Sequence, residues 1–448
     1  MSMTLIRNAA ILTMDQHRRV IPDGYVVIEG PSIMAVGDGE PDPGLRFDET
    51  IDAQGKVLMP GFVQIHVHLC QALFRGLSDD MELMDWLRTR TWPLEACHDE
   101  ESVYASARLG IAEMLRGGTT TILDMQSVNH AEAAFHGIRD TGIRAVSGKV
   151  MMDWGDDVPE PLREVTEESL ARSIELFEEW DGAAGGRIGY AFTPRFAVSC
   201  SDRLLREVGE IARQKGARVH THSSENLGEI EIVMRERGKR NILYLEDAGL
   251  LGPTTVLAHC IHLDKAEFDA LARTGTNVAH CPSANLKLAS GIANIPEMLD
   301  AGINVGLGAD GAGDNNNLDQ LMEMRMAALV HKPRLGPRAM PAMRVLELAT
   351  INGARALGWD HIIGSLEAGK RADIIMLDLA MPHSSPASVA DPVSRVVYSA
   401  QSQNVVMTMV DGKVLFDNGR LTTMDEAEVL CEADEAIGRL ARRAGVLA

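Results

Sequence analysis

The stretch "IARQKGARVHTH", residues 211–222, holds the pattern that decides the fold. Apolar and charged side chains at helical spacing come first, Gly216 stands where a helix ends in a left-handed cap, and a short strand follows at once. The same order of helix, glycine and strand recurs along the chain at residues 111–125, 137–150, 245–260, 271–281 and 298–310. Helices that alternate with strands predict a parallel sheet.

Two further strands complete the pattern, one in "GFVQIHVH" (residues 61–68) and one in "GRIGYAFTP" (residues 186–194). The eight strands read as continuous apolar runs, as strands buried on both faces do. We therefore predict an α/β protein with a closed (β/α)8 TIM barrel over residues 58–365. An open doubly wound sheet is the alternative.

The two ends of the chain have a different pattern, with strands and turns but no helix. Residues 1–57 and 366–421 are expected to pair into one small β-sandwich domain beside the barrel. Residues 422–448 carry acidic side chains early and arginines late at helical spacing, which predicts a C-terminal helix.

Composition excludes several classes of function. The chain has 448 residues and a net charge of −21, which argues against binding to nucleic acid. No apolar run approaches the ~18 residues of a membrane span, and the N-terminus lacks the pattern of a signal peptide. Six cysteines without a C-x-x-C pair suit a reducing compartment. We expect a cytoplasmic protein with no membrane partner.

Side chains that bind metals or transfer protons cluster where the predicted strands end. In a barrel, chemistry collects at the carboxyl ends of the strands. The residues at these ends are His66, His68, His220, His222, Glu225, His259, His280 and Asp310. Histidines two apart on a strand face the same side and can share a metal ion; the alternative is an incidental pair.

Strand 5 offers two histidines, and the choice between them depends on "HSSE", residues 222–225. We select His222 because Glu225 follows three residues later, where a loop can bring its carboxylate back over the metal. His220 then lies one layer deeper and is interpreted as a core histidine. Three imidazoles and a carboxylate would leave a position for water, whose pKa zinc lowers toward ~7. For Glu225 the alternative is a helix N-terminal residue stabilised by the dipole.

These motifs together resemble the amidohydrolase superfamily, in its branch of zinc-dependent aminohydrolases. The resemblance spans nearly the whole chain and is carried by "PGFVQIHVH", "HSSE", "LAHC", "HCPSANLKLASG" and "GLGADGAGDNNNLDQLMEM". It implies that the metal ligands are His66, His68, His222 and Asp310.

The resemblance also implies the catalytic roles. Asp310 would accept the proton of the attacking water, Glu225 would protonate the ring nitrogen beside the reacting carbon, and His259 would orient the hydroxide. Relatives with two metals bridge them by a modified lysine on strand 4, which "RIGYAFTPRF" lacks. One divalent metal is expected, Zn²⁺ before Fe²⁺ or Mn²⁺.

The stretch "GLGADG", residues 306–311, also fits the dinucleotide pattern G-x-G-x-x-G. That pattern indicates a nucleotide cofactor only after the first strand of a βαβ unit, with an acidic residue ~20 positions on. Here it closes the eighth strand, so we do not interpret it as a cofactor site.

Two resemblances bear on the substrate. Residues 73–96 and the run "NNNLDQLMEMRMAALVHK" look like deaminases of methylthioadenosine and S-adenosylhomocysteine, and like triazine hydrolases. In the nucleoside deaminases the residue matching Glu95 holds ribose hydroxyls; the alternative is a solvated carboxylate at a helix end.

The second resemblance is to guanine deaminases. The stretch "TPRFAVSCS" contains Arg195 and Phe196, which match residues that hold the purine, and Gln71 matches a guanine-binding glutamine. Adenosine-type enzymes usually carry histidine where Arg195 stands. An ion pair at the barrel rim is the alternative for Arg195.

We predict an aminohydrolase that releases ammonia from an aminopurine-type heterocycle, with an adenine nucleoside such as methylthioadenosine, S-adenosylhomocysteine or 5'-deoxyadenosine first. A guanine or pterin deaminase is second and an s-triazine hydrolase third. A barrel without catalysis and an amide-ring hydrolase of the dihydropyrimidinase kind remain further alternatives. The partners expected are a small heterocyclic substrate and, by resemblance, other copies of the chain in a homo-oligomer.

Overall fold

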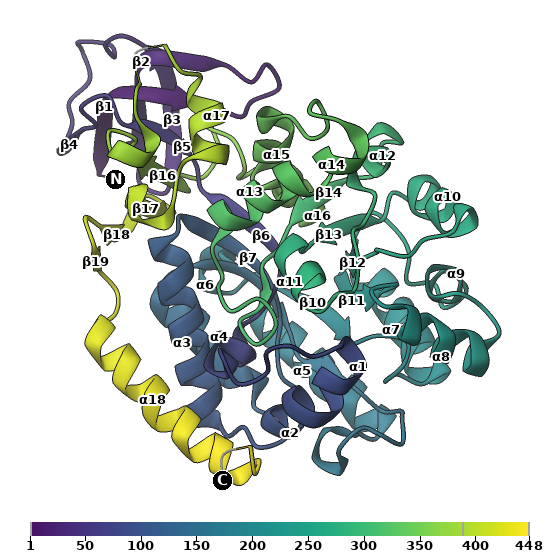
Figure 1. The fold of residues 1–448 in the computed structure, drawn as a ribbon. Coiled ribbons are helices and arrows are strands. Elements are labelled where there is room, and N and C mark those ends of the chain that lie inside the picture. Colours follow the sequence, from purple (N-terminus) through teal and green to yellow (C-terminus); the bar gives the residue numbers. More distant parts are fainter. Residues whose placement is uncertain (1, 388, 447–448) are drawn as a thin grey trace. The chain divides into compact units, whose positions relative to one another are not determined.

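The computed structural model describes residues 2–387 and 389–446. Within this range the repeated helix–glycine–strand pattern builds one parallel sheet. In Figure 1 the colours of its strands follow the sequence from β6 to β14. Its strands are β6 (Phe62–His68), β7 (Thr119–Met125), β8 (Arg144–Gly148), β9 (Val150–Met151), β10 (Ile188–Pro194), β11 (Arg218–Ser223), β12 (Thr255–His259), β13 (Asn277–His280), β14 (Val305–Leu307) and β15 (Asp310–Gly311). The sheet order is β14-β13-β12-β11-β10-β8-β7-β6-β15, with β9 beside β10.

The eighth strand stretch closes this sheet. Its first part, β14, pairs in parallel with β13, and its second part, β15, pairs in parallel with β6. One short segment therefore joins the seventh strand to the first. The predicted (β/α)8 barrel is confirmed, and the open doubly wound sheet is excluded.

Gly216 shows why the pattern predicts this fold. Helix α7 (Asp202–Lys215) begins at Ser201, whose side chain accepts a hydrogen bond from the backbone N–H of Leu204. It ends at Gly216, which has a φ of 63° and donates its N–H to the carbonyl of Ala212. Only glycine adopts this left-handed conformation readily, so the chain turns there and enters β11.

A second glycine allows the barrel to close around its first strand. A Cβ atom on Gly308 would lie 2.5 Å from the carbonyl oxygen of His66 and 2.8 Å from its Cβ. These separations are too short for any side chain, so glycine is required there. The backbone before Asp310 can therefore lie against His66.

The two chain ends build a separate sheet of nine strands, most of them antiparallel. Its order is β19-β18-β17-β16-β5-β1-β2-β3, with β4 paired to β1. Strand β5 pairs antiparallel with β16 and so joins the N-terminal strands to the C-terminal ones. The strands are β1 (Met3–Leu12), β2 (Val20–Glu29), β3 (Ser32–Asp38), β4 (Glu49–Asp52), β5 (Val57–Pro60), β16 (Ile374–Leu377), β17 (Val405–Val410), β18 (Lys413–Asp417) and β19 (Arg420–Leu421). The prediction that both ends form one β unit is confirmed.

The remaining helices connect the strands or follow them. They are α1 (Leu83–Trp86), α2 (Trp92–Glu95), α3 (Glu100–Arg116), α4 (Ala131–Thr141), α5 (Thr166–Trp180), α6 (Ala183–Gly186), α8 (Leu227–Arg237), α9 (Asn241–Asp247), α10 (Lys265–Thr274), α11 (Pro282–Lys287), α12 (Ile295–Asp300), α13 (Gln320–Val330), α14 (Lys332–Leu335), α15 (Ala342–Leu348), α16 (Ile351–Ala356), α17 (Pro392–Tyr398) and α18 (Glu426–Arg443). None of the described helices is long and apolar enough to cross a bilayer.

The C-terminal helix forms as α18 within the residues expected for it. Its side chains Ala433, Ala436 and Leu440 pack with Phe74 in one buried apolar cluster.

The chain divides into two compact units, one with residues up to 64, 112–121 and 319–426, and the other with residues 65–111, 122–318 and 427 onward. The domain boundaries near residues 57 and 365 stay predictions.

Candidate metal centre and active site

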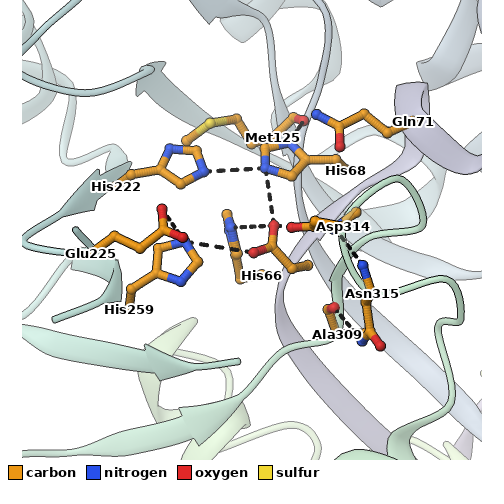
Figure 2. Close-up of polar contacts among 12 residues, drawn as sticks. His66, His68, Gln71, Met125, His222, Glu225, His259, Ala309, Asp314 and Asn315 are labelled. Atoms are coloured by element: carbon orange, nitrogen blue, oxygen red, sulfur yellow. Dashed lines mark hydrogen bonds and ion pairs between the residues drawn. The ribbon is translucent and has the colours of Figure 1, made fainter. Parts of the chain in front are cut away.

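Four of the predicted side chains converge at the carboxyl end of the barrel. His66 and His68 come from β6, His222 from β11 and Asp310 from β15. One ligand-type atom of each lies within 4.8 Å of the others. Figure 2 shows the rings of His66, His68 and His222 pointing toward one another. Three of the four residues are buried and His222 is partly buried.

The hydrogen bonds of His68 and His222 fix where their protons lie. Nδ1 of His68 lies 2.8 Å from the carbonyl oxygen of Met125, and Nδ1 of His222 lies 2.8 Å from that of Arg195. A carbonyl only accepts, so each ring carries its proton on Nδ1 and an unprotonated lone pair on Nε2. Burial lowers the pKa of His68 to about 3 and lowers that of His222 well below its ordinary value, which keeps both rings neutral.

His66 reaches the same state through a neighbouring ring. Nδ1 of His220 donates to the carbonyl oxygen of Val256 at 3.0 Å, so its Nε2 accepts from Nδ1 of His66 at 2.7 Å. Nε2 of His66 is then unprotonated, and it has no hydrogen-bond partner among the described residues. His220 is buried and outside the cluster, as expected of a core histidine, and it also orients a cluster member.

Whether these residues fit a metal ion depends on where the three Nε2 lone pairs point. Nε2 of His68 faces Nε2 of His222 at 3.2 Å, and Nε2 of His66 faces Oδ1 of Asp310 at 3.1 Å. Electron pairs held face to face in a buried site repel one another unless a cation lies between them. Three neutral imidazoles and a carboxylate form a four-ligand donor set that suits zinc and leaves a fifth position for water. The residues fit a divalent metal.

The link between His220 and His66 gives a first prediction. We expect His220→Leu to weaken zinc affinity about 10- to 100-fold, because a ligand that loses its orienting partner binds metal less tightly. Titration of the metal-free protein with zinc measures this. His98→Leu is the matched control, since His98 is a buried histidine that bonds to Ser102 and to the carbonyl of Cys70 instead. Equal zinc affinity in wild type and His220→Leu would contradict the role.

Glu225 and His259 stand beside the cluster. Oε2 of Glu225 lies 3.5 Å from Nε2 of His259, and its Oε1 accepts from the hydroxyl of Ser290 at 3.2 Å. Nδ1 of His259 donates to Oδ1 of Asn285 at 2.8 Å, and its Nε2 lies 3.6 Å from Oδ2 of Asp310. Nε2 of His259 therefore faces the carboxylates of both Glu225 and Asp310.

The surroundings of Glu225 and His259 raise the pKa of both side chains. Burial raises the pKa of Glu225, which favours a carboxyl that can carry a proton. Burial opposes the charged form of His259, but the carboxylates of Glu225 and Asp310 outweigh it and raise the pKa of the ring. A protonated acid beside a hydrogen-bond donor is an arrangement suited to proton transfer.

The backbone is strained at three points of this site. Ser224, His259 and Asp310 have φ values of 55°, 72° and 67°, in the left-handed region that non-glycine residues rarely adopt. Such conformations concentrate at functional sites, where the surrounding structure holds them. Here Ser224 and His259 lie at or just beyond the ends of β11 and β12, and Asp310 is the first residue of β15.

The cavity above the cluster is small and partly lined by apolar side chains. Its volume is about 20 Å³, room for about one water molecule. Its lining residues are His68, Leu83, Trp86, Leu87, Arg195, Phe196, His222, Glu225, His259, Leu288, Asp310 and Asp314. Arg195 and Phe196, predicted as substrate contacts, therefore do face the cavity.

Glu95 and Gln71, the other predicted substrate contacts, lie behind Arg195. Nη1 and Nη2 of Arg195 donate to Oε2 and Oε1 of Glu95 at 2.5 and 3.2 Å, and Nε2 of Gln71 donates to Oε1 at 2.9 Å. Glu95 and Arg195 are only 1% and 3% exposed. The structure thus joins the three residues in one buried network, and neither Glu95 nor Gln71 is among the described residues that line the cavity.

Sequence reasoning missed Asp314 and Asn285. Asp314 is buried, lines the cavity and lies four positions after Asp310; burial and the Asp310 charge raise its pKa well above the ordinary value. Asn285 orients His259 from the "HCPSANLK" stretch. Their only sequence signal was proximity to predicted site residues.

His280, predicted at the rim, is buried at the end of β13 and is not part of the four-residue cluster.

Comparison with protein families gives one match, to the model described as the amidohydrolase family, over residues 57–415. Two curated relatives are similar along almost the whole chain. A 5-methylthioadenosine/S-adenosylhomocysteine deaminase of Syntrophomonas wolfei is 39% identical over 97% of this chain and 99% of its own. A 5'-deoxyadenosine deaminase of Methanosarcina acetivorans is 40% identical over 98% of this chain and 99% of its own.

Solved structures of similar proteins share the fold. An adenosine deaminase from Xanthomonas campestris with bound zinc has a TM-score of 0.91 at 32% identity and covers 98% of both chains. The guanine deaminase of E. coli has a TM-score of 0.82 at 29% identity and covers 94% of this chain and 100% of its own. The predicted fold class is confirmed by these likenesses and by the closed sheet.

Proposed function

Because the chain belongs to the amidohydrolase family, we propose that it is a metal-dependent deaminase of an adenine nucleoside such as methylthioadenosine, S-adenosylhomocysteine or 5'-deoxyadenosine. The family match and the relatives at about 40% identity confirm the prediction of a hydrolase that acts on carbon–nitrogen bonds. The observation that carries the proposal is the convergence of three unprotonated Nε2 atoms and the Asp310 carboxylate beside Glu225.

The number and identity of the metal ions, and the residues that would bind them, are also part of this proposal. His66, His68, His222 and Asp310 would hold one zinc ion, and β10 has no lysine that could bridge a second. When bound, zinc supplies Lewis acidity that lowers the pKa of a water molecule and so provides a nucleophile near neutral pH. Fe²⁺ and Mn²⁺ remain alternatives for the same ligands.

The side chains around the cluster would move the protons of the reaction. Asp310 would take a proton from the attacking water while Glu225 gives one to the ring nitrogen beside the reacting carbon. His259, held through Asn285, would donate Nε2–H to the oxygen that gains charge. A proton passed to the exocyclic nitrogen then lets the carbon–nitrogen bond break, and ammonia leaves. Each step uses a group within 3.6 Å of a neighbour in the site.

A second candidate function is the deamination of guanine or another oxo-heterocycle such as a pterin. Arg195 faces the cavity and offers hydrogen-bond donors that match an oxo group, whereas Glu95 lies behind it. Triazine hydrolysis is third. A barrel without catalysis is disfavoured, because all four proposed ligands converge and the two proposed acid–base groups, Glu225 and His259, lie beside them.

The test is ammonia release by the zinc-loaded protein, with methylthioadenosine, 5'-deoxyadenosine and guanine assayed side by side. We expect release from the nucleosides, loss of more than 99% of it after chelation, and recovery when zinc is added back. Release from guanine alone would overturn the nucleoside assignment in favour of the second candidate. Release that survives complete removal of the metal would contradict the metal-dependent mechanism.

Two broader predictions stay predictions. A homo-oligomer and a cytoplasmic location were expected from resemblance and composition. Size-exclusion chromatography with light scattering tests the first of them directly.

A further inference from the structure

The Glu95 carboxylate is almost fully occupied by the protein itself. A carboxylate has about four acceptor positions, two on each oxygen. Oε1 accepts from Gln71 and from Nη2 of Arg195, and Oε2 accepts from Nη1 of Arg195. Among the residues that the structure describes, none fills the fourth position, on Oε2. A vicinal pair of hydroxyls needs two free positions, which Glu95 does not have.

Arg195 also stands on the cavity side of this pair. It lines the cavity next to Phe196, and the backbone carbonyl of Arg195 accepts the Nδ1–H of His222. The guanidinium therefore belongs to the same rigid segment that orients a cluster histidine. Two of its five N–H groups donate to Glu95, and a third, on Nη1, points to the sulfur of Met152 at 4.0 Å. The other two remain for an acceptor atom of a substrate.

Breaking this pair to release Glu95 would be unfavourable. Both side chains are buried, the contact is bidentate, and separation leaves two opposite charges without a partner in the interior. A neutral hydroxyl pair cannot replace the charge of Arg195. A substrate is therefore expected to meet the intact pair.

We propose that Arg195 sets the substrate specificity of this site by occupying Glu95. The pair does not read the two ribose hydroxyls, and the remaining Arg195 N–H groups select a neutral acceptor atom of the substrate, such as a ring nitrogen, an ether oxygen or an oxo group. The proposal rests on the proposed deaminase function and deepens it. It predicts an enzyme that accepts adenine nucleosides with or without the vicinal diol.

The wild-type protein alone tests this. We expect kcat/KM for ammonia release from 5'-deoxyadenosine and from 2',3',5'-trideoxyadenosine to agree within about 3-fold. A site built to hold hydroxyls rejects an analogue that lacks them by about 100-fold or more, because its buried polar groups are left unpaired. A preference of that size for the hydroxyl-bearing nucleoside would overturn the proposal.

A variant tests the role of Arg195 itself. In Arg195→Gln, Glu95 regains two acceptor positions, so the preference for 5'-deoxyadenosine over the trideoxy analogue should rise at least 10-fold. Arg240→Gln is the matched control, since Arg240 also pairs with a buried glutamate, Glu267, at 2.7 Å but lies outside the site. An unchanged preference in a folded Arg195→Gln would contradict the role; if that variant does not fold, the wild-type comparison decides.

The same experiment separates this proposal from the proposed function. If neither nucleoside releases ammonia, the nucleoside deaminase function fails, and the dissociation constants of the two nucleosides with the zinc-loaded protein replace kcat/KM. Dissociation constants within about 3-fold then support the specificity role, whereas tighter binding of the diol by 100-fold, or binding of neither, overturns it.

Discussion

Asp310→Asn should lower kcat by about 10⁴-fold, because in the proposed mechanism one carboxylate binds the metal and also takes the proton of the attacking water. Its Oδ1 lies 3.1 and 3.4 Å from Nε2 of His66 and His68, and its Oδ2 lies 3.6 Å from Nε2 of His259. An amide keeps the shape but cannot take a proton, and it is a weaker metal ligand. The measurement is steady-state ammonia release together with the zinc content of the purified variant.

The control replaces another carboxylate that accepts several hydrogen bonds in the same unit. Asp153 accepts from the backbone N–H and hydroxyl of Ser201 at 2.6 Å each and from Thr166 at 2.7 Å, and it is not a member of the four-residue cluster. Asp153→Asn should lower thermal stability and leave kcat within about 3-fold. An active Asp310→Asn enzyme would remove this carboxylate from the mechanism, whether or not zinc stays bound.

The barrel could be predicted because its signals are local. A glycine at a left-handed cap and the strand that follows it lie within a dozen residues, and this unit recurs along the chain. The convergence of the candidate metal ligands could also be predicted. Strand periodicity puts His66 and His68 on one side of their strand, and the carboxyl ends of parallel strands lie together. Closure by Gly308 against His66 needed the structure, because a close approach has no periodic signal.

The polar network behind the cavity could not be predicted, because it depends on partners far apart in the chain. Glu95 and Arg195 are 100 residues apart, and His66 and His220 are 154 apart. A sequence shows which residue types are present but not which of them meet. Resemblance gave Glu95 and Arg195 separate roles from two different subgroups, and the structure shows that in this chain they bond to each other.

Glu225→Gln should lower kcat by about 10³-fold while zinc content stays near that of wild type. Glu225 lies outside the four-residue cluster, so the ligands are untouched. Burial raises the pKa of Glu225, which fits a side chain that carries a proton to the ring nitrogen and later passes one to the leaving amine. The glutamine amide still accepts from Ser290 but has no proton to cycle. Steady-state ammonia release with metal analysis measures both quantities.

The comparison that isolates this role is Glu231→Gln, six residues later in the first turns of α8, where the side chain is exposed. That variant loses the same charge from the same segment and should keep wild-type kcat. If Glu225→Gln also keeps near-normal turnover, Glu225 does not shuttle the proton, and its burial beside His259 reflects packing alone. If it loses zinc together with activity, the carboxylate supports the metal cluster instead, because a pure proton carrier leaves the ligands occupied.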